Sequence, residues 1–278
     1  MDRIDAAHGR IRTLPFSRHA ACCACFGRPQ FSRVSSSVHS RPAEVCTDYH
    51  PRHGAGAVRI VERIFQNRRE AGAVLARRLL SEYGDRSDIV VLAIPRGGVP
   101  VGFEIAQTLH APLDVLVVRK LGVPGHEELA MGAIATGEVT VVNRELVQAL
   151  SIPETELLRV EALEQLELNR RELAYRGSRP PLPVQGQIVI IVDDGLATGS
   201  TMRAAVMATR QREPAKVVVA VPVSSIEACD RLMVGADEVV CVQTPYDFSG
   251  VGQWYQDFEA TSDTEVRDLM EHAMRAYP

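Results

Sequence analysis

This sequence contains little lysine, no long apolar segment and no surplus of positive charge. No stretch approaches the roughly 20 consecutive apolar residues of a membrane-spanning helix, and the amino terminus lacks the basic start and apolar block of a secretory signal. The formal net charge of -4 leaves no excess of cations for coating nucleic acid. We therefore expect a cytoplasmic protein that engages neither a membrane nor nucleic acid.

Lysine is the scarcest charged residue, because only Lys120 and Lys216 occur among 31 basic residues. An ammonium group is a compact point charge that suits phosphate, whereas a guanidinium group is a planar fork. A lysine in a chain that otherwise uses arginine is therefore a candidate for phosphate binding. Lys120 is the better candidate, since it follows an apolar run directly.

Residues 1–57 show neither helical nor strand periodicity, and no acidic residue occurs between Asp5 and Glu44. We expect a disordered leader here and one folded domain over residues 58–278. The Arg-rich, Ser-rich composition resembles an organelle transit peptide, but the use of arginine throughout the chain explains it more simply. Whether the leader is functional, a targeting segment or the product of a misassigned start site stays open.

Five short apolar runs alternate with helical segments in the rest of the chain. Unbroken apolar strands are buried on both faces, and strands separated by helices form parallel sheets. The sequence therefore predicts an α/β fold, a doubly wound parallel sheet of about five strands that binds ligands beyond the carboxyl ends of its strands. Before the sheet, Asn67 and Glu70 have capping-box spacing, which predicts a helix that ends near Gly84. The runs cover residues 89–94, 113–118, 187–192, 216–221 and 238–242.

An insertion of residues 121–186 separates the second run from the third and is longer than a crossover requires. Residues 129–135 and 139–143 predict a β-hairpin, and residues 154–176 predict a long charged helix. A flap over the active site and a dimerisation arm explain the insertion equally well, so a homodimer is left open.

Two carboxylates, Asp193 and Asp194, stand where the third apolar run ends, before a loop that leads into a predicted helix. Free N–H groups at a helix start, glycines for close approach and hydroxyl side chains form a cradle for phosphate. The carboxylates can accept hydrogen bonds from the vicinal hydroxyls of a ribose ring. The segment thus suits a ribose 5-phosphate. The cradle residues are Gly195, Leu196, Ala197, Thr198, Gly199, Ser200 and Thr201.

This pattern resembles the type I phosphoribosyltransferase family, whose signature is an apolar strand, two acidic residues, two variable residues and a Thr/Gly-rich turn. The resemblance implies that Asp193 and Asp194 are the catalytic pair on the ribose hydroxyls, and that residues 195–201 hold the 5-phosphate of 5-phosphoribosyl-1-pyrophosphate (PRPP). Paired aspartates also occur in receiver domains and magnesium-dependent phosphatases, but neither usually continues into LATGST. The whole pattern is similar to a bacterial group of phosphoribosyltransferases predicted from sequence, whose acceptor is not established.

A second family feature is a loop after the first strand that holds pyrophosphate. Arg96, Gly97 and Gly98 follow the first apolar run, where the arginine offers charge-assisted hydrogen bonds and the glycines let the backbone approach the oxygens. The family commonly carries a basic residue where Lys120 stands, which implies a further contact with pyrophosphate. A solvated basic strand end is the alternative for Lys120.

The C-terminal segment, residues 243–278, concentrates aromatic residues in a chain that is only 5% aromatic. Phe248, Trp254 and Tyr255 are candidates for a hood that stacks on an acceptor base. A small packing core for the terminal segment explains the cluster at least as well.

The resemblance implies a pentosyltransferase that moves the 5-phosphoribosyl group from Mg-PRPP to a nitrogenous acceptor such as a nucleobase and releases pyrophosphate. Mg²⁺ is the implied cofactor, held by PRPP oxygens without direct protein ligands. Ala197 stands where hypoxanthine-guanine enzymes carry an acid for the purine N7, which argues against that subgroup. The alternative function is a non-catalytic module that senses PRPP.

Overall fold

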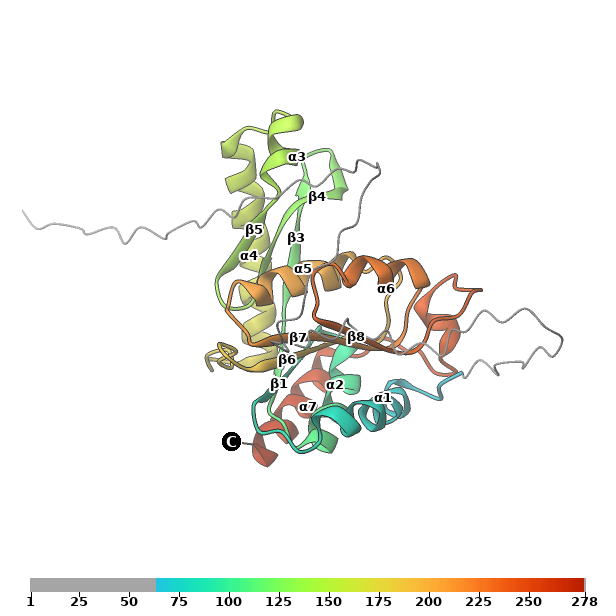
Figure 1. Ribbon diagram of the computed structural model, residues 1–278. Coiled ribbons are helices and arrows are strands. Elements are labelled where there is room, and N and C mark those ends of the chain that lie inside the picture. Colours follow the sequence, from blue (N-terminus) through green and yellow to red (C-terminus); the bar gives the residue numbers. More distant parts are fainter. Residues whose placement is uncertain (1–63, 278) are drawn as a thin grey trace, which may run out of the picture. The chain divides into compact units, whose positions relative to one another are not determined.

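The computed structural model describes residues 64–277 and contains a parallel sheet between two layers of helices, with a smaller sheet beside it (Figure 1). The expected leader, residues 1–57, lies outside the described residues. The helices are α1 Arg68–Tyr83, α2 Gly98–Leu109, α3 Arg144–Ala149, α4 Glu154–Arg176, α5 Ser200–Arg210, α6 Ile226–Leu232, α7 Asp263–Ala276 and the 3-10 helix η1 Val251–Trp254. The strands are β1 Ile89–Ala93, β2 Leu113–Val115, β3 Val118–Val123, β4 His126–Ala135, β5 Val139–Val142, β6 Ile188–Val192, β7 Lys216–Val223 and β8 Glu238–Gln243.

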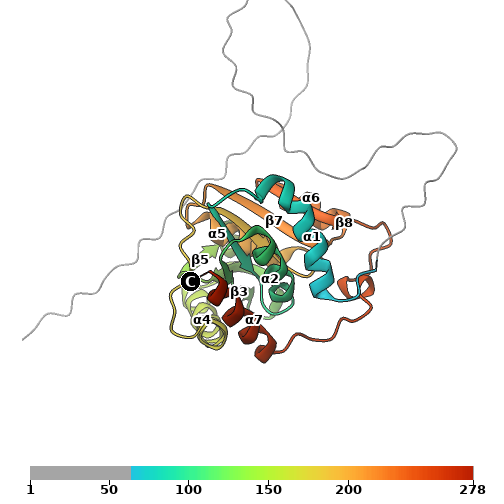
Figure 2. The same ribbon diagram turned by 90° about the horizontal axis from the view of Figure 1, so that it is seen from below.

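The main sheet has the strand order β2-β1-β6-β7-β8, and all of its pairings are parallel. Because side chains alternate along a strand, Val91 and Ile190 pack toward α1, α2 and α7, whereas Leu92 and Ile191 pack toward α5 and α6. Figure 2 shows the first of these helical layers from its outer side. The predicted parallel sheet with five strands, covered on both faces, is confirmed.

Helix α1 begins as its capping pattern predicts. The Asn67 side chain accepts a 3.0 Å hydrogen bond from the Glu70 backbone N–H, and Glu70 Oε2 accepts one of 2.6 Å from the Gln66 N–H. The first bond satisfies a backbone donor that a helix start leaves unpaired, and the second engages the residue before the N-cap. They also fix Arg68 in the first turn of α1, close to the carboxyl ends of the main strands.

The second predicted strand, residues 113–118, is wrong as a single element. β2 ends at Val115, and Val118 already belongs to β3 of a separate three-stranded antiparallel sheet ordered β3-β4-β5. An apolar run reports burial, but burial does not specify the sheet with which a residue pairs. Lys120 therefore lies within a strand of the second sheet, opposite Ala133, and not directly after a strand of the main sheet.

The remaining elements of the insertion agree with their predictions. β4 and β5 form the expected hairpin, and α4 has the bounds that its charge and apolar pattern indicate. The short helix α3 was not predicted. α4 packs against α7, and the hairpin of β4 and β5 packs against α5, so the insertion contacts helices of both layers.

A buried ion pair joins the end of α4 to β2. Arg176 Nε lies 2.9 Å from Asp114 Oδ1, with only 3% and 5% of the two side chains exposed. Arg176 also donates to the Val115 carbonyl oxygen at 2.8 Å, and Asp114 accepts from the Leu182 N–H at 3.0 Å. These bonds compensate the cost of burying both charges. Within residues 64–277, no helix combines the length and the apolar character that crossing a membrane requires.

Candidate functional site

The two loops singled out in the sequence lie side by side at the carboxyl edge of the main sheet. β1 and β6 are neighbours in register, with Ala93 opposite Val192. The Ile94 N–H then donates to the Val192 carbonyl oxygen at 2.9 Å, which holds the start of one loop against the start of the other. Residues 95–98 and 193–200 thus form one site.

Gly97 and Gly98 allow this close approach of the two loops. A Cβ atom on Gly97 would lie 2.0 Å from Asp194 Oδ2, and one on Gly98 would lie 2.7 Å from the Val192 carbonyl oxygen. Both distances are far below van der Waals contact, so any side chain here would push the loops apart. The glycines are therefore needed for loop packing, in addition to the predicted approach of the backbone to pyrophosphate.

The acidic pair is electrostatically strained. Burial and the neighbouring Asp194 charge raise the pKa of Asp193 well above its ordinary value, although its carboxylate accepts a 2.9 Å hydrogen bond from the Asp194 N–H. Burial also raises the pKa of Asp194, but its hydrogen bond from Arg68 acts in the opposite direction. Hydrogen bonds from hydroxyl groups, or a nearby cation, favour the ionised form of such carboxylates and so oppose the rise in their pKa.

Arg68 is a site residue that sequence reasoning missed. Its Nε donates to Asp194 Oδ2 at 2.8 Å, and its side chain is only 12% exposed. NH1 donates to the Glu259 carbonyl oxygen at 2.7 Å, and the guanidinium lies 4.0 Å from the centre of the Phe258 ring. Arg68 therefore connects α1, the acidic pair and the C-terminal segment. The two ends of this contact are 126 residues apart, so no local pattern indicates it.

The cradle is anchored at one end and open at the other. The Leu196 N–H donates to the Val223 carbonyl oxygen at 3.0 Å, the Ser225 N–H donates to the Leu196 carbonyl oxygen at 3.1 Å, and the Leu196 side chain is 3% exposed. Leu196 thus anchors the cradle, and its engaged N–H and buried side chain do not agree with the predicted contact with phosphate. Ala197 and Thr198 are exposed, whereas Ser200 and Thr201 at the start of α5 are half-buried.

Two glycines shape the cradle. Gly199 has a φ of 70°, a conformation that glycine adopts without strain, and it caps the amino end of α5. A Cβ on Gly195 would lie 2.5 Å from Val251 Cγ1, so this glycine makes room for the C-terminal segment.

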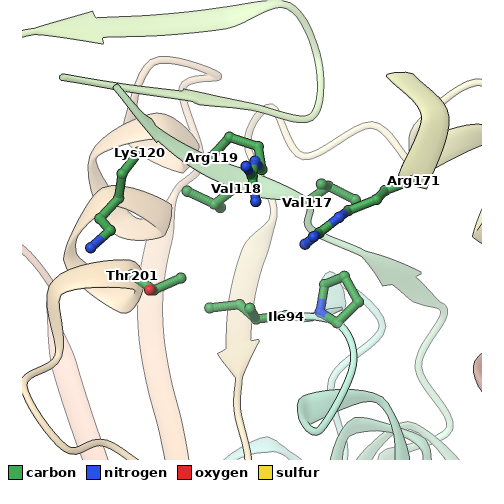
Figure 3. A pocket seen from close by; sticks show the side chains of 8 residues that line it. Ile94, Val117, Val118, Arg119, Lys120, Arg171 and Thr201 are labelled. Carbon is green, nitrogen blue, oxygen red and sulfur yellow. The ribbon is translucent and has the colours of Figure 1, made fainter. Parts of the chain in front are cut away.

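A cavity of about 260 Å³ opens beside the cradle (Figure 3). Three cations line it: Arg119 and Lys120 of β3, and Arg171 of α4. Thr201 of the cradle also lines it, as does Pro95, the residue before Arg96. Lys120 consequently faces the same space as both motifs. Ile94, Val117 and Val118 form the apolar part of the wall.

Arg96 itself lies outside the lining of this cavity. Its side chain is 49% exposed, and its NH1 is 3.9 Å from Asp263 Oδ1 at the start of α7. This long contact in solvent holds the Arg96 side chain only weakly.

The C-terminal aromatic residues divide into buried and accessible ones. Trp254 and Tyr255 are 5% and 6% exposed and pack with Phe65, as the packing-core alternative describes. Phe248 packs against the same cluster from its edge. Buried rings lack a free face for a base, so the burial of Trp254 and Tyr255 does not agree with the predicted stacking on an acceptor. The Tyr255 hydroxyl instead donates to the Asp194 carbonyl oxygen at 2.5 Å. The accessible aromatic residue beside Arg68 is Phe258, stacked on Tyr255.

Comparison with known proteins identifies the family. Residues 61–255 match the model of the phosphoribosyl transferase domain. The protein of Mycobacterium tuberculosis H37Rv named "Putative phosphoribosyl transferase Rv0571c" is 46% identical over 215 residues, which are 77% of this chain and 48% of that protein. The chain thus spans about half the length of the curated relatives it matches.

A solved structure is similar over nearly its whole length. The crystal structure of the protein TT1426 from Thermus thermophilus has 41% sequence identity and a TM-score of 0.69, and the match covers 75% of this chain and 98% of that one. Together with the family match over residues 61–255, this similarity shows that the chain belongs to the phosphoribosyl transferase domain family.

Proposed function

We propose that this protein transfers the 5-phosphoribosyl group from Mg-PRPP to a nitrogenous acceptor such as a nucleobase, with release of pyrophosphate. The observation that carries the proposal is the meeting of three features at one edge of the sheet. These are the acidic pair at Asp193 and Asp194, the cradle at residues 195–201, and the cationic cavity that contains Lys120. Each suits one part of PRPP.

The ribose would lie against the acidic pair. Vicinal hydroxyls donate hydrogen bonds to carboxylates, and such bonds favour the ionised form of groups whose pKa burial has raised. In the reaction, the bond between ribose C1 and the diphosphate oxygen breaks as the acceptor nitrogen forms a bond to C1. Positive charge that develops on the ribose ring is stabilised by two adjacent carboxylates.

The two phosphate-containing ends would be held separately. Backbone N–H groups at the start of α5, with the hydroxyls of Thr198, Ser200 and Thr201, suit the 5-phosphate. Lys120, and Arg96 after a small movement, suit the departing pyrophosphate, because cations stabilise the charge that grows on it.

The donor set fits a magnesium ion that arrives with the substrate. Within residues 64–277 there is no group of three or more His, Cys, Asp or Glu side chains able to hold a metal ion. Asp193 and Asp194 form a pair, and Arg68 engages one of them. Mg²⁺ keeps most of its ligands from water and substrate phosphates in such sites. Bound to PRPP, it would neutralise diphosphate charge, while the protein supplies position and orientation.

The test is a panel of nucleobases incubated with the protein, Mg²⁺ and PRPP, with pyrophosphate release as the readout. We expect release with at least one base and none without protein. PRPP binding by calorimetry without release from any acceptor would instead indicate a PRPP-sensing module. Absence of PRPP binding would refute both functions.

A further inference from the structure

The inserted helix α4 contributes a cation to the cavity between the two motifs. Arg171, in the C-terminal half of that helix, lines the cavity together with Pro95 and Lys120 (Figure 3). We propose that Arg171 binds the diphosphate group of the ribosyl substrate, so that the insertion forms part of the active site. The identity of the substrate in this assignment rests on the proposed function. The assignment gives the insertion a role in substrate binding that is separate from the roles of the two sequence motifs.

The ion pairs around the cavity leave Arg171 available. Arg119 is more fully engaged than Arg171, because its Nε and NH2 both lie 2.6 Å from Glu164 Oε2. Arg171 donates one hydrogen bond, from its Nε–H to Glu167 Oε1 at 2.8 Å. Its terminal nitrogens have no hydrogen-bond partner among the described residues. Those nitrogens are the part of a guanidinium that binds phosphate oxygens in pairs.

The carboxylate that holds Arg171 is shared. Glu167 also accepts from its other neighbour, Arg170, at 2.7 and 2.9 Å. Hydrogen bonds from these two arginines lower the pKa of Glu167 to about 2, so it stays ionised and orients both side chains. One carboxylate shared by two guanidinium groups leaves an excess of positive charge. Lys120 adds a further positive charge, because its nearest carboxylate, on Glu128, is 3.8 Å away and fully exposed.

A second contact places this part of α4 beside the predicted pyrophosphate loop. The Tyr175 hydroxyl, one turn after Arg171, donates to Asp263 Oδ1 at 2.8 Å, and the same oxygen lies 3.9 Å from Arg96 NH1. Burial raises the pKa of Tyr175, and the charges of Arg171 and Arg96 both oppose that rise. Tyr175 and Arg96 thus share one carboxylate oxygen, which places the turn of α4 that follows Arg171 beside the predicted pyrophosphate loop.

Adjacent arginines on α4 provide a matched test. Arg171→Met and Arg170→Met each remove one positive charge from the same Glu167, but only Arg171 lines the cavity, and the Arg170 side chain is 60% exposed. The full chain and each variant are titrated by calorimetry with Mg-pyrophosphate, Mg-PRPP and ribose 5-phosphate. Thermal unfolding of each variant checks that it is folded.

We expect Arg171→Met to weaken binding of pyrophosphate and PRPP by about ten- to a hundredfold, the range of one hydrogen bond to a charged group. Binding of ribose 5-phosphate should be unchanged, and Arg170→Met should bind all three ligands normally. Arg171→Lys should retain part of the pyrophosphate affinity, because the charge remains without the paired donors.

Unchanged pyrophosphate binding by Arg171→Met would overturn the inference, as would a parallel loss of ribose 5-phosphate. Lack of pyrophosphate binding by the unaltered chain would overturn it too. Pyrophosphate binding that depends on Arg171, without release of pyrophosphate from PRPP by any acceptor, would keep the inference and reject transferase activity.

Discussion

Replacing Asp193 with asparagine should weaken substrate binding and stabilise the fold at the same time. Asparagine keeps the shape of the side chain and an oxygen that can accept the Asp194 N–H, but it removes the charge. A hydrogen bond from a ligand hydroxyl to a charged group contributes about 1.5–3 kcal/mol. We therefore expect the Kd for Mg-PRPP to rise by about ten- to a hundredfold in Asp193→Asn, and further in the double variant with Asp194→Asn.

The stability effect follows from the raised pKa of Asp193 in the folded chain. Between the ordinary aspartate pKa of about 4 and the raised one, the folded protein holds a proton that the unfolded chain has lost, so the free energy of unfolding falls as pH rises through this window. Each unit of elevation costs about 1.4 kcal/mol at neutral pH. Asp193→Asn removes that cost, so it should be more stable than the unaltered chain at neutral pH, with the difference vanishing near pH 4.

Urea denaturation at several pH values measures the stability, and calorimetry with Mg-PRPP measures the binding. Asp88→Asn is the matched control: it removes the same charge just before β1, where a hydrogen bond from Arg86 lowers the pKa of Asp88. This control should bind PRPP normally and show no gain of stability at neutral pH. Normal PRPP binding by Asp193→Asn, or a loss of stability that is larger at neutral pH than in acid, would refute the reasoning.

Three further predictions concern the glycine between the two loops, the arginine that contacts the acidic pair, and the buried ion pair of α4. Gly97→Ala should abolish PRPP binding in calorimetry, because its Cβ would lie 2.0 Å from Asp194 Oδ2, whereas Gly250→Ala, with no atom within 4 Å of its Cβ, should bind normally. Arg68→Met should raise the pKa of Asp194 further and move the loss of PRPP affinity in acid to higher pH; an unshifted pH profile of Kd would contradict this. Arg176→Met should lower the free energy of unfolding in urea by about 3–5 kcal/mol, because it leaves a buried carboxylate unpaired; a change below about 1 kcal/mol would count against that ion pair.

Local sequence patterns were sufficient for most of the elements and for the order of the motifs. Apolar runs reported burial on both faces of β1 and β6, and the Asn67 and Glu70 pair reported the start of α1. The bounds of α4 were also predictable, because one continuous charged and apolar pattern ends at Gly177. These features depend on neighbouring residues, so the sequence contains their signal directly.

Contacts between distant residues required the tertiary structure. Arg68 reaches Asp194 across 126 residues, and the need for glycine at Gly97 comes from that same carboxylate. The burial of Trp254 depends on a cluster that includes Phe65, at the other end of the described chain. Composition cannot distinguish a ring that packs in a core from one that faces a ligand.

The sequence by itself determined that an acidic pair and a phosphate cradle follow one buried strand, because chain connectivity alone places residues 193–201 after β6. Only the tertiary structure decided which cations share their cavity. Arg171 belongs to a helix that begins almost forty residues before the acidic pair, at Glu154, and it comes to the site because α4 packs along β3. Packing between elements sets such distances, and a pattern along one element does not contain them.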